Sequence, residues 1–137
     1  DLHYFSEYSI IPSVQPTHAT SDMYWAESRL CKHRMPGAYS YKTLLAHSGI
    51  LPLGTDFPVE YVSPFFTIRA ARFRQDATGF PKNAFKKEEA LNSQETFAGM
   101  SRVERHRTVN ELLDEELKAG LHALAIEPAA PGEKTRW

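Results

Sequence analysis

The chain has 137 residues, of which 42% are hydrophobic and 24% charged, and this composition is typical of a globular protein of at most one domain rather than a disordered polymer or a collagen. The formal net charge of −1 argues against a protein whose main role is to bind nucleic acid. The single Cys31 excludes an internal disulfide, and no apolar run approaches the ~18 residues of a membrane helix. We therefore expect a cytoplasmic protein without a membrane segment. Because the chain begins with Asp1 rather than Met, we also expect a processed product or a piece of a longer protein.

The first predicted strand follows a short helix. Apolar residues spaced for one helical face predict a helix over residues 2–8. Residues 9–17 then form a β-branched apolar run that Pro12 interrupts and Pro16 closes, a pattern that favours a buried parallel strand with an irregular end. His18 follows this strand directly.

A helix and a second strand come next. Ser21 and Asp22 are candidate N-caps, which predicts a short helix and a loop over residues 19–36. Residues 38–48 carry apolar side chains at spacings of three and four, and a glycine stops the predicted helix. Residues 50–56 form another short apolar segment. The order strand, helix, strand indicates an α/β fold.

The rest of the chain is predicted to be mainly helical. Pro64 stands at the first position of a helix expected over residues 63–76, and Ser93 is a candidate cap for a short helix. Ser101 and Glu104 form the Ser-x-x-Glu signature of a capping box, at the start of a helix expected to end near residue 118. The apolar alternation of residues 121–127 predicts a last strand, and a loose tail follows it.

Two polar groups follow the predicted strands. Asp56 stands in Gly-Thr-Asp-Phe-Pro at the carboxyl end of the second strand, where ligands and metals bind in α/β folds. The other interpretation is that Asp56 caps a turn before Pro58. Gln15, Thr17 and His18 would face the same end, where His18 is a candidate to orient a substrate oxygen or move a proton; the alternative is a histidine hydrogen-bonded within a loop.

A basic triplet, Arg105, His106 and Arg107, lies in the first turns of the helix that the capping box begins. His106 is a candidate ligand of a metal or cluster, and the arginines are candidates to hold an acidic partner. The alternative is a solvated helix face whose arginines make only screened surface pairs. The chain lacks a Gly-x-Ser-x-Gly elbow, a phosphate loop, a Gly-x-Gly-x-x-Gly motif and a His-Glu-x-x-His motif.

Residues 1–97 resemble the C-terminal third of amidohydrolase-superfamily enzymes, in the branch that includes N-substituted formamide deformylase. The motifs that carry this resemblance are Gln-Pro-Thr-His-Ala-Thr-Ser-Asp-Met and Gly-Thr-Asp-Phe-Pro-Val-Glu. The resemblance implies the seventh and eighth strands of a (β/α)8 barrel, at residues 9–17 and 50–56, in a metal-dependent hydrolase of non-peptide, amide-like C–N bonds. It implies a divalent metal such as zinc, with Asp56 as its ligand and as the catalytic base, and places His18 beside a small-molecule substrate.

The same resemblance predicts that the isolated chain is inactive. The His-x-His of the first barrel strand and the metal-binding groups of the middle strands have no counterpart here, and one carboxylate is fewer than the three protein ligands of a catalytic zinc. Two barrel strands would also leave unpaired edges.

Residues 97–133 resemble the C-terminal half of the BolA-like family, an α/β fold related to class II KH domains. Arg-His-Arg, Val-Asn-Glu-Leu-Leu and Gly-Leu-His-Ala-Leu-Ala-Ile carry this resemblance. It implies that His106 is a ligand of an iron–sulfur cluster shared with a monothiol glutaredoxin. The first helix and the first two strands of that family are missing.

We therefore predict an α/β chain in two parts, an incomplete (β/α)8 barrel fragment at residues 1–97 and a BolA-like helix and strand at residues 98–137. The two resemblances meet near Phe97 to Met100. This junction predicts a chimeric or mis-joined sequence, or else a piece excised from a longer chain. Three functions stay open: part of a C–N hydrolase, a glutaredoxin-binding module, and a chain without activity.

Overall fold

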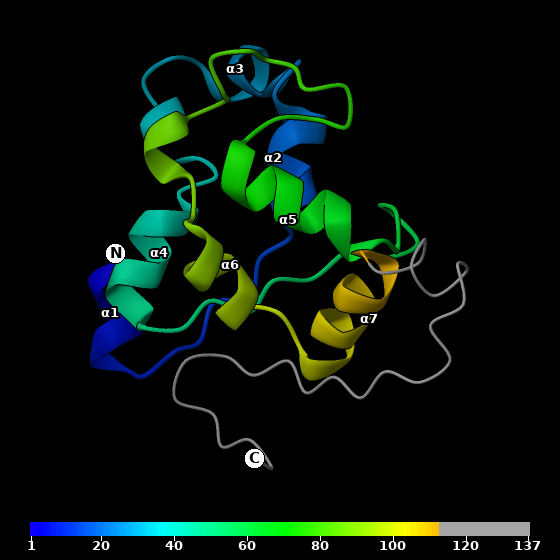
Figure 1. Ribbon diagram of the computed structural model, residues 1–137. Coiled ribbons are helices and arrows are strands. Elements are labelled where there is room, and N and C mark those ends of the chain that lie inside the picture. Colours follow the sequence, from blue (N-terminus) through cyan, green and yellow to red (C-terminus); the bar gives the residue numbers. More distant parts are fainter. Residues whose placement is uncertain (113–137) are drawn as a thin grey trace, which may run out of the picture.

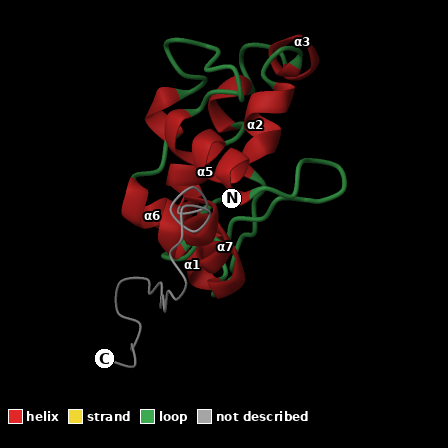
Figure 2. Cartoon of the chain, turned by 45° about the vertical axis from the view of Figure 1, so that its right-hand side comes forward, coloured by secondary structure: helices red, strands yellow, loops and turns green. Residues whose placement is uncertain are grey.

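The computed structural model describes the backbone of residues 1–112 and the side chains of residues 1–110. Helices dominate this part of the chain (Figures 1 and 2). The α-helices are α1 (His3–Glu7), α2 (Pro16–Asp22), α3 (Ala26–Leu30), α4 (Tyr41–Ser48), α5 (Pro64–Phe73), α6 (Ser93–Ala98) and α7 (Arg102–Leu112). Two short 3-10 turns, η1 (Met35–Gly37) and η2 (Lys87–Glu89), separate some of them. No helix among the described residues is long and apolar enough to cross a membrane.

The two predicted strands meet in a single parallel bridge between Val14 and Leu53. The Val14 amide donates to the carbonyl of Pro52 at 3.0 Å, and the Gly54 amide donates to the carbonyl of Val14 at 2.9 Å. The two segments therefore lie side by side and parallel, as neighbouring barrel strands do. The prediction of two full strands is nevertheless not confirmed, because no ladder extends beyond this bridge in residues 1–112.

Proline explains much of this difference. Pro16 begins α2 instead of closing a strand, since its missing N–H costs nothing in the first helical turn. Pro12 also withholds a donor from any longer ladder. Ser21 and Asp22 thus lie inside α2 rather than at an N-cap, and the short helix predicted after them corresponds to α3, which begins at Ala26.

Two capping boxes organise the second half of the described chain. The Asn92 side chain accepts from the Glu95 amide and the Glu95 carboxylate accepts from the Asn92 amide, so Asn92, and not the predicted Ser93, caps α6. The Glu104 carboxylate accepts from the Ser101 amide at 2.8 Å, and the Ser101 hydroxyl accepts from the Glu104 amide at 3.2 Å, as the capping-box signature predicts. The predicted strand at 121–127 lies outside the described residues.

The core gathers under the bridge and between α2 and α5. Its buried apolar members come from elements far apart in the sequence: Ala19, Tyr41, Leu51, Leu53, Ala71 and Leu91. Alanines on α2 and α5 are fully buried, which lets the two helices approach closely (Figure 1). The Gly99 backbone packs on the bridge, because its carbonyl accepts from the Leu53 amide at 2.7 Å.

Arg74 occupies the centre of this core and is 0% exposed. It ends α5 in a left-handed conformation with φ of 54°, which turns its side chain inward. Its Nε donates to the carbonyl of Phe85 at 2.9 Å and one terminal nitrogen donates to the carbonyl of Tyr39 at 3.2 Å. The guanidinium lies 4.9 Å from the centroid of the Tyr41 ring, so carbonyls and aromatic faces replace its water.

Candidate functional site

The structure brings His18 and Asp56 together. His18 lies in the first turn of α2, three residues after Gln15 and four after the bridge residue Val14, and Asp56 lies three residues after the bridge residue Leu53. The parallel bridge therefore places both side chains at the same end of the paired segments. Nε2 of His18 is 3.1 Å from Oδ2 of Asp56, and the two side chains are 32% and 44% exposed.

The Nε2 atom of His18 can still form a hydrogen bond. The Nε2 atom of His18 is itself buried, and it has no hydrogen-bond partner among the described residues. Its approach to Asp56 is thus a close contact without hydrogen-bond geometry. A buried nitrogen in this state favours a role in binding, because an unpartnered polar atom is costly.

Asp56 combines both interpretations of its motif. Its backbone has φ of 56°, and its carbonyl accepts from the Val59 amide at 2.8 Å, so the residue does form a turn. Aspartate tolerates this left-handed conformation better than most residues. The carboxylate takes no part in the turn's recorded hydrogen bonds and faces His18 instead.

The described residues do not complete a metal centre. His18 and Asp56 give two donors, and no group of three His, Cys, Asp or Glu side chains that could hold an ion occurs within the described part of the chain. A catalytic zinc has three protein ligands. The described residues are therefore too few to hold a resident metal by themselves.

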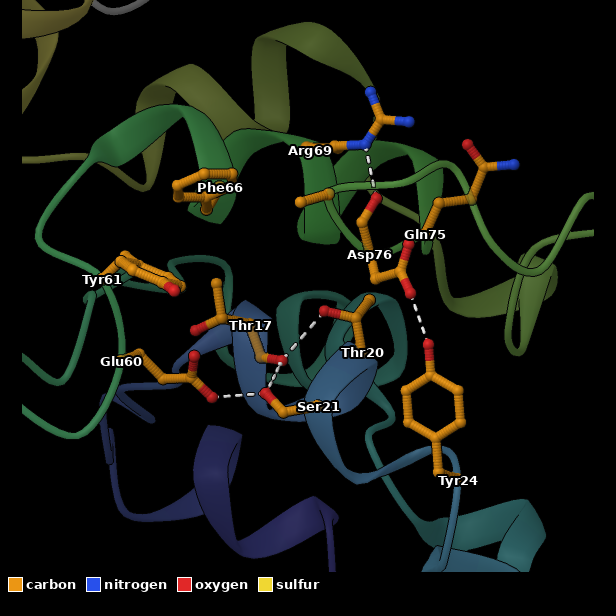
Figure 3. A pocket seen from close by; sticks show the side chains of 11 residues that line it. Thr17, Thr20, Ser21, Tyr24, Glu60, Tyr61, Phe66, Arg69, Gln75 and Asp76 are labelled. Carbon is orange, nitrogen blue, oxygen red and sulfur yellow. Dashed lines mark hydrogen bonds between the residues drawn. The ribbon is translucent and has the colours of Figure 1, made fainter.

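A pocket of about 210 Å³ opens between α2, the segment after Asp56, and α5 (Figure 3). Thr17, Thr20 and Ser21 line it from one face of α2, Tyr24 lines it from the turn after that helix, and Glu60, Tyr61 and Phe66 line another side. The sequence pattern did not predict this pocket, because residues 9–17 are predicted to be a strand and Thr17 therefore the end of that strand. The spacing of three, four and seven from Thr17 is the signal that would have found this polar helix face.

The far end of the pocket is closed by a hydrogen-bonded turn around Asp76. One Asp76 oxygen accepts from the Tyr24 hydroxyl, and the other accepts from the Thr78 amide at 2.8 Å and its hydroxyl at 2.7 Å. The Tyr24 hydrogen bond first, and then those from Thr78, lower the pKa of Asp76 to about 2. Both of its oxygens are in use, so Asp76 has a structural role here.

The basic triplet divides into three environments on α7. Arg105 is only 3% exposed and its guanidinium lies 5.5 Å from the Phe97 ring centroid, so the solvated-face interpretation is wrong for this residue. Arg107 is exposed and His106 is half-buried. His106 lies on α7, whereas His18 lies on α2 and Asp56 on the loop before α5, so the two sets of candidate residues belong to different elements.

Comparison with known proteins divides the chain in the same way. Residues 91–133 match the BolA-like protein family, and the match begins six residues before the boundary expected at residue 97. An uncharacterized protein of a Sinorhizobium species, encoded in the cobS 5' region, is 78% identical over 41 residues, which cover 30% of this chain and 44% of that protein. The family match does not reach half of the chain.

The other similarities are to hydrolases. A putative amidohydrolase, YtcJ of Bacillus subtilis, is 36% identical over 64 residues, 47% of this chain and 12% of that protein. The crystal structure of an uncharacterized metal-dependent hydrolase from Pyrococcus furiosus superposes with a TM-score of 0.50 and 31% identity over 72% of this chain and 21% of that one. The chain thus spans less than half the length of each of these relatives. Its N-terminal part is similar to amidohydrolases and its C-terminal part to BolA-like proteins, and the chain has a chimeric, two-part makeup.

Proposed function

We propose that residues 1–97 are a portion of a metal-dependent hydrolase that cleaves amide-like C–N bonds other than peptide bonds, in the branch that includes N-substituted formamide deformylase. The observation that carries this proposal is the 3.1 Å approach of His18 to Asp56 at the end of two parallel segments. The similarity to a metal-dependent hydrolase structure over 72% of the chain supports it.

Asp56 is proposed as a metal ligand and proton acceptor, since a carboxylate oxygen suits both roles. His18 is proposed at the substrate, where its buried Nε2 has bonding capacity left for a substrate oxygen. The resemblance implies a divalent ion such as zinc in the complete enzyme, where Asp56 would be one of its ligands and the ion would supply the chemistry of a metal-bound water. Because His18 and Asp56 are only two donors, we expect the chain alone to be inactive.

The test is to replace the corresponding segment of the Pyrococcus furiosus hydrolase with residues 1–97 and to measure hydrolysis of non-peptide amides. Asp56→Asn should lower the rate of the graft by about 100-fold or more, the usual effect of removing an acid–base group. Glu27→Gln, an exposed site on α3, is the matched control and should leave the rate unchanged. Undiminished activity of the Asp56→Asn graft would refute the proposed role.

The BolA-like match supports a second candidate function. We propose that His106 is a ligand of an iron–sulfur cluster shared with a monothiol glutaredoxin. His106 lies within the matched residues and is half-buried on α7. His106→Ala should change the visible absorption spectrum of the complex, whereas His33→Ala, at an exposed loop position, should not. An identical spectrum for both variants would exclude His106 as a ligand.

A chain without either activity is the third possibility, and it is distinguished by negative results in both assays. The cytoplasm is the proposed compartment. The exposed, unpaired Cys31 supports it, because a reducing compartment keeps such a thiol free.

A further inference from the structure

Thr17 poses a question that the proposed hydrolase site does not answer. The residue is 5% exposed, and its Oγ1 has no hydrogen-bond partner among the described residues. Its side chain rises from α2 toward the rings of Tyr61 and Phe66, on the wall of the pocket (Figure 3). A buried hydroxyl without a partner costs about 1–3 kcal/mol, so this atom points to a ligand that can hydrogen-bond to it.

Glu60 supplies the charge of this part of the pocket. Its carboxylate accepts a close hydrogen bond from the Ser21 hydroxyl. That hydroxyl also lies 2.7 Å from the carbonyl oxygen of Thr17, so its one hydrogen is shared between two acceptors. The Glu60 carboxylate therefore keeps acceptor capacity, close to the unpartnered hydroxyl of Thr17.

The other charged groups of the pocket are engaged elsewhere. Arg69 donates from Nε to the Asp76 carbonyl at 2.7 Å, and its guanidinium points away from Thr17 and Glu60 in Figure 3. Both carboxylate oxygens of Asp76 accept hydrogen bonds from its own turn and from Tyr24. The charge that faces the pocket is thus negative, and its source is Glu60.

Aromatic rings complete the site. The Tyr61 and Phe66 rings lie 5.3 Å apart between centroids and are tilted by 44°, on the side of the pocket that Glu60 occupies. A carboxylate and a hydroxyl beside aromatic faces favour a cation that carries an apolar group. An anion would be repelled by Glu60, and the described residues hold no group of three His, Cys, Asp or Glu side chains for a metal ion.

We propose that this pocket binds a protonated amine with an apolar substituent, its ammonium group on Glu60 and Thr17 and its substituent against Tyr61 and Phe66. Its place beside the candidate site suggests what the amine is: Thr17 precedes His18, and the Glu60 amide lies 3.4 Å from the Asp56 carbonyl. Hydrolysis of an amide-like bond breaks C–N, forms C–O from water and transfers a proton to the nitrogen, which leaves as an amine. The role as leaving-amine subsite rests on the proposed function, whereas the binding itself does not.

The test is to titrate the full chain with phenethylammonium. Calorimetry measures the affinity, and the amide chemical shifts of α2 report where the ligand binds. The neutral 2-phenylethanol and the anionic phenylacetate serve as matched probes of the same size. We expect phenethylammonium to bind about tenfold tighter than 2-phenylethanol, because only the ammonium group makes a charge-assisted hydrogen bond to Glu60. Phenylacetate should bind least, because Glu60 repels its carboxylate. Equal affinity for ammonium and alcohol, or no binding, would overturn the proposal without any variant.

Two substitutions locate the site. Glu60→Gln should weaken ammonium binding about tenfold and leave binding of the alcohol unchanged. Thr17→Val keeps the shape of the side chain and should weaken ammonium binding several-fold, while Glu27→Gln should have no effect. Unchanged ammonium affinity in a folded Glu60→Gln chain would also overturn the proposal.

The two proposals fail separately. If the chain binds the ammonium but the hydrolase graft is inactive, the proposed function is refuted and the amine pocket is supported. If the graft is active but the chain does not prefer the ammonium, the amine pocket is refuted and the proposed function is supported.

Discussion

His18 and Asp56 lie 38 positions apart in the chain, yet Nε2 of one is 3.1 Å from Oδ2 of the other. This short distance depends on a single parallel bridge between Val14 and Leu53. His18 follows Val14 by four positions and Asp56 follows Leu53 by three, so the bridge brings the two side chains together. The integrity of that bridge is therefore a condition for the site, and it is open to a direct test.

Gly99→Ala should break the bridge. A Cβ at this position would lie 2.5 Å from the Leu51 carbonyl oxygen and 2.8 Å from Leu53 Cγ, and backbone atoms cannot move aside cheaply. We expect a loss of about 1–3 kcal/mol in the free energy of unfolding, as for other overpacked sites. Urea unfolding measures it, and Gly37→Ala, which would meet nothing within 4 Å, is the control. Equal unfolding midpoints for the two variants would contradict this packing.

Arg74→Lys should destabilise the core even though it keeps the charge. Lysine cannot donate to the carbonyls of Tyr39 and Phe85 in the fork geometry of arginine while lying over the Tyr41 ring. The left-handed backbone at residue 74 is equally strained with arginine and with lysine. The difference in the free energy of unfolding therefore reports the change of side chain. We expect a loss of about 2–3 kcal/mol, the cost of a buried donor network left incomplete. Arg29→Lys, at an exposed site in the last turn of α3, should be neutral.

Glu89 caps the N-terminus of α4 although it lies 46 positions after Thr43 in the sequence. The adjacent Glu88 provides a matched control. Its carboxylate accepts from the Thr43 amide at 2.9 Å and from the Thr43 hydroxyl at 2.6 Å, whereas the Ser40 side chain makes no cap. Glu89→Gln should lower the free energy of unfolding by about 1 kcal/mol, the typical value of a cap. The adjacent Glu88→Gln should change it little, since Glu88 is exposed. A similar loss in both variants would point to net charge rather than to the cap.

The stability of the chain should fall in acid because of Asp76. Its pKa in the folded chain is about 2, lowered first by the Tyr24 hydrogen bond, against an unfolded value near 4. The unfolded chain therefore binds the proton at higher pH than the folded chain does. The contribution is complete above pH ~4 and is lost as the pH falls toward 2, and solvent screening keeps it small.

Urea midpoints between pH 2 and 5 measure this dependence. Asp76→Asn should flatten the curve in that window, because asparagine does not titrate. Glu27→Gln should leave the slope as it is in the unmodified chain. An unchanged slope in Asp76→Asn would mean that other carboxylates account for the acid sensitivity.

Local features of the fold could be predicted from the sequence, because their hydrogen bonds join residues three or four apart. The capping box of Ser101 and Glu104 is present as its signature indicates, and Pro64 begins α5. Gly49 ends α4 in a left-handed conformation, as the predicted glycine stop requires. These choices depend on the nearest neighbours in the chain and not on the rest of the molecule.

The tertiary structure decided the remainder. Pro16 suits both the end of a strand and the first turn of a helix. A strand is stable only where a partner strand supplies its hydrogen bonds. Within residues 1–112 that pairing is limited to the bridge at Val14. The end of α5 at Phe73, rather than at residue 76, follows from the inward turn of Arg74 into the core. The pocket of Thr17 and Glu60 likewise joins side chains 43 positions apart. The motifs by themselves thus indicated which residues carry chemistry, and packing alone determined which of them meet, because contacts between distant segments are set by burial and not by spacing.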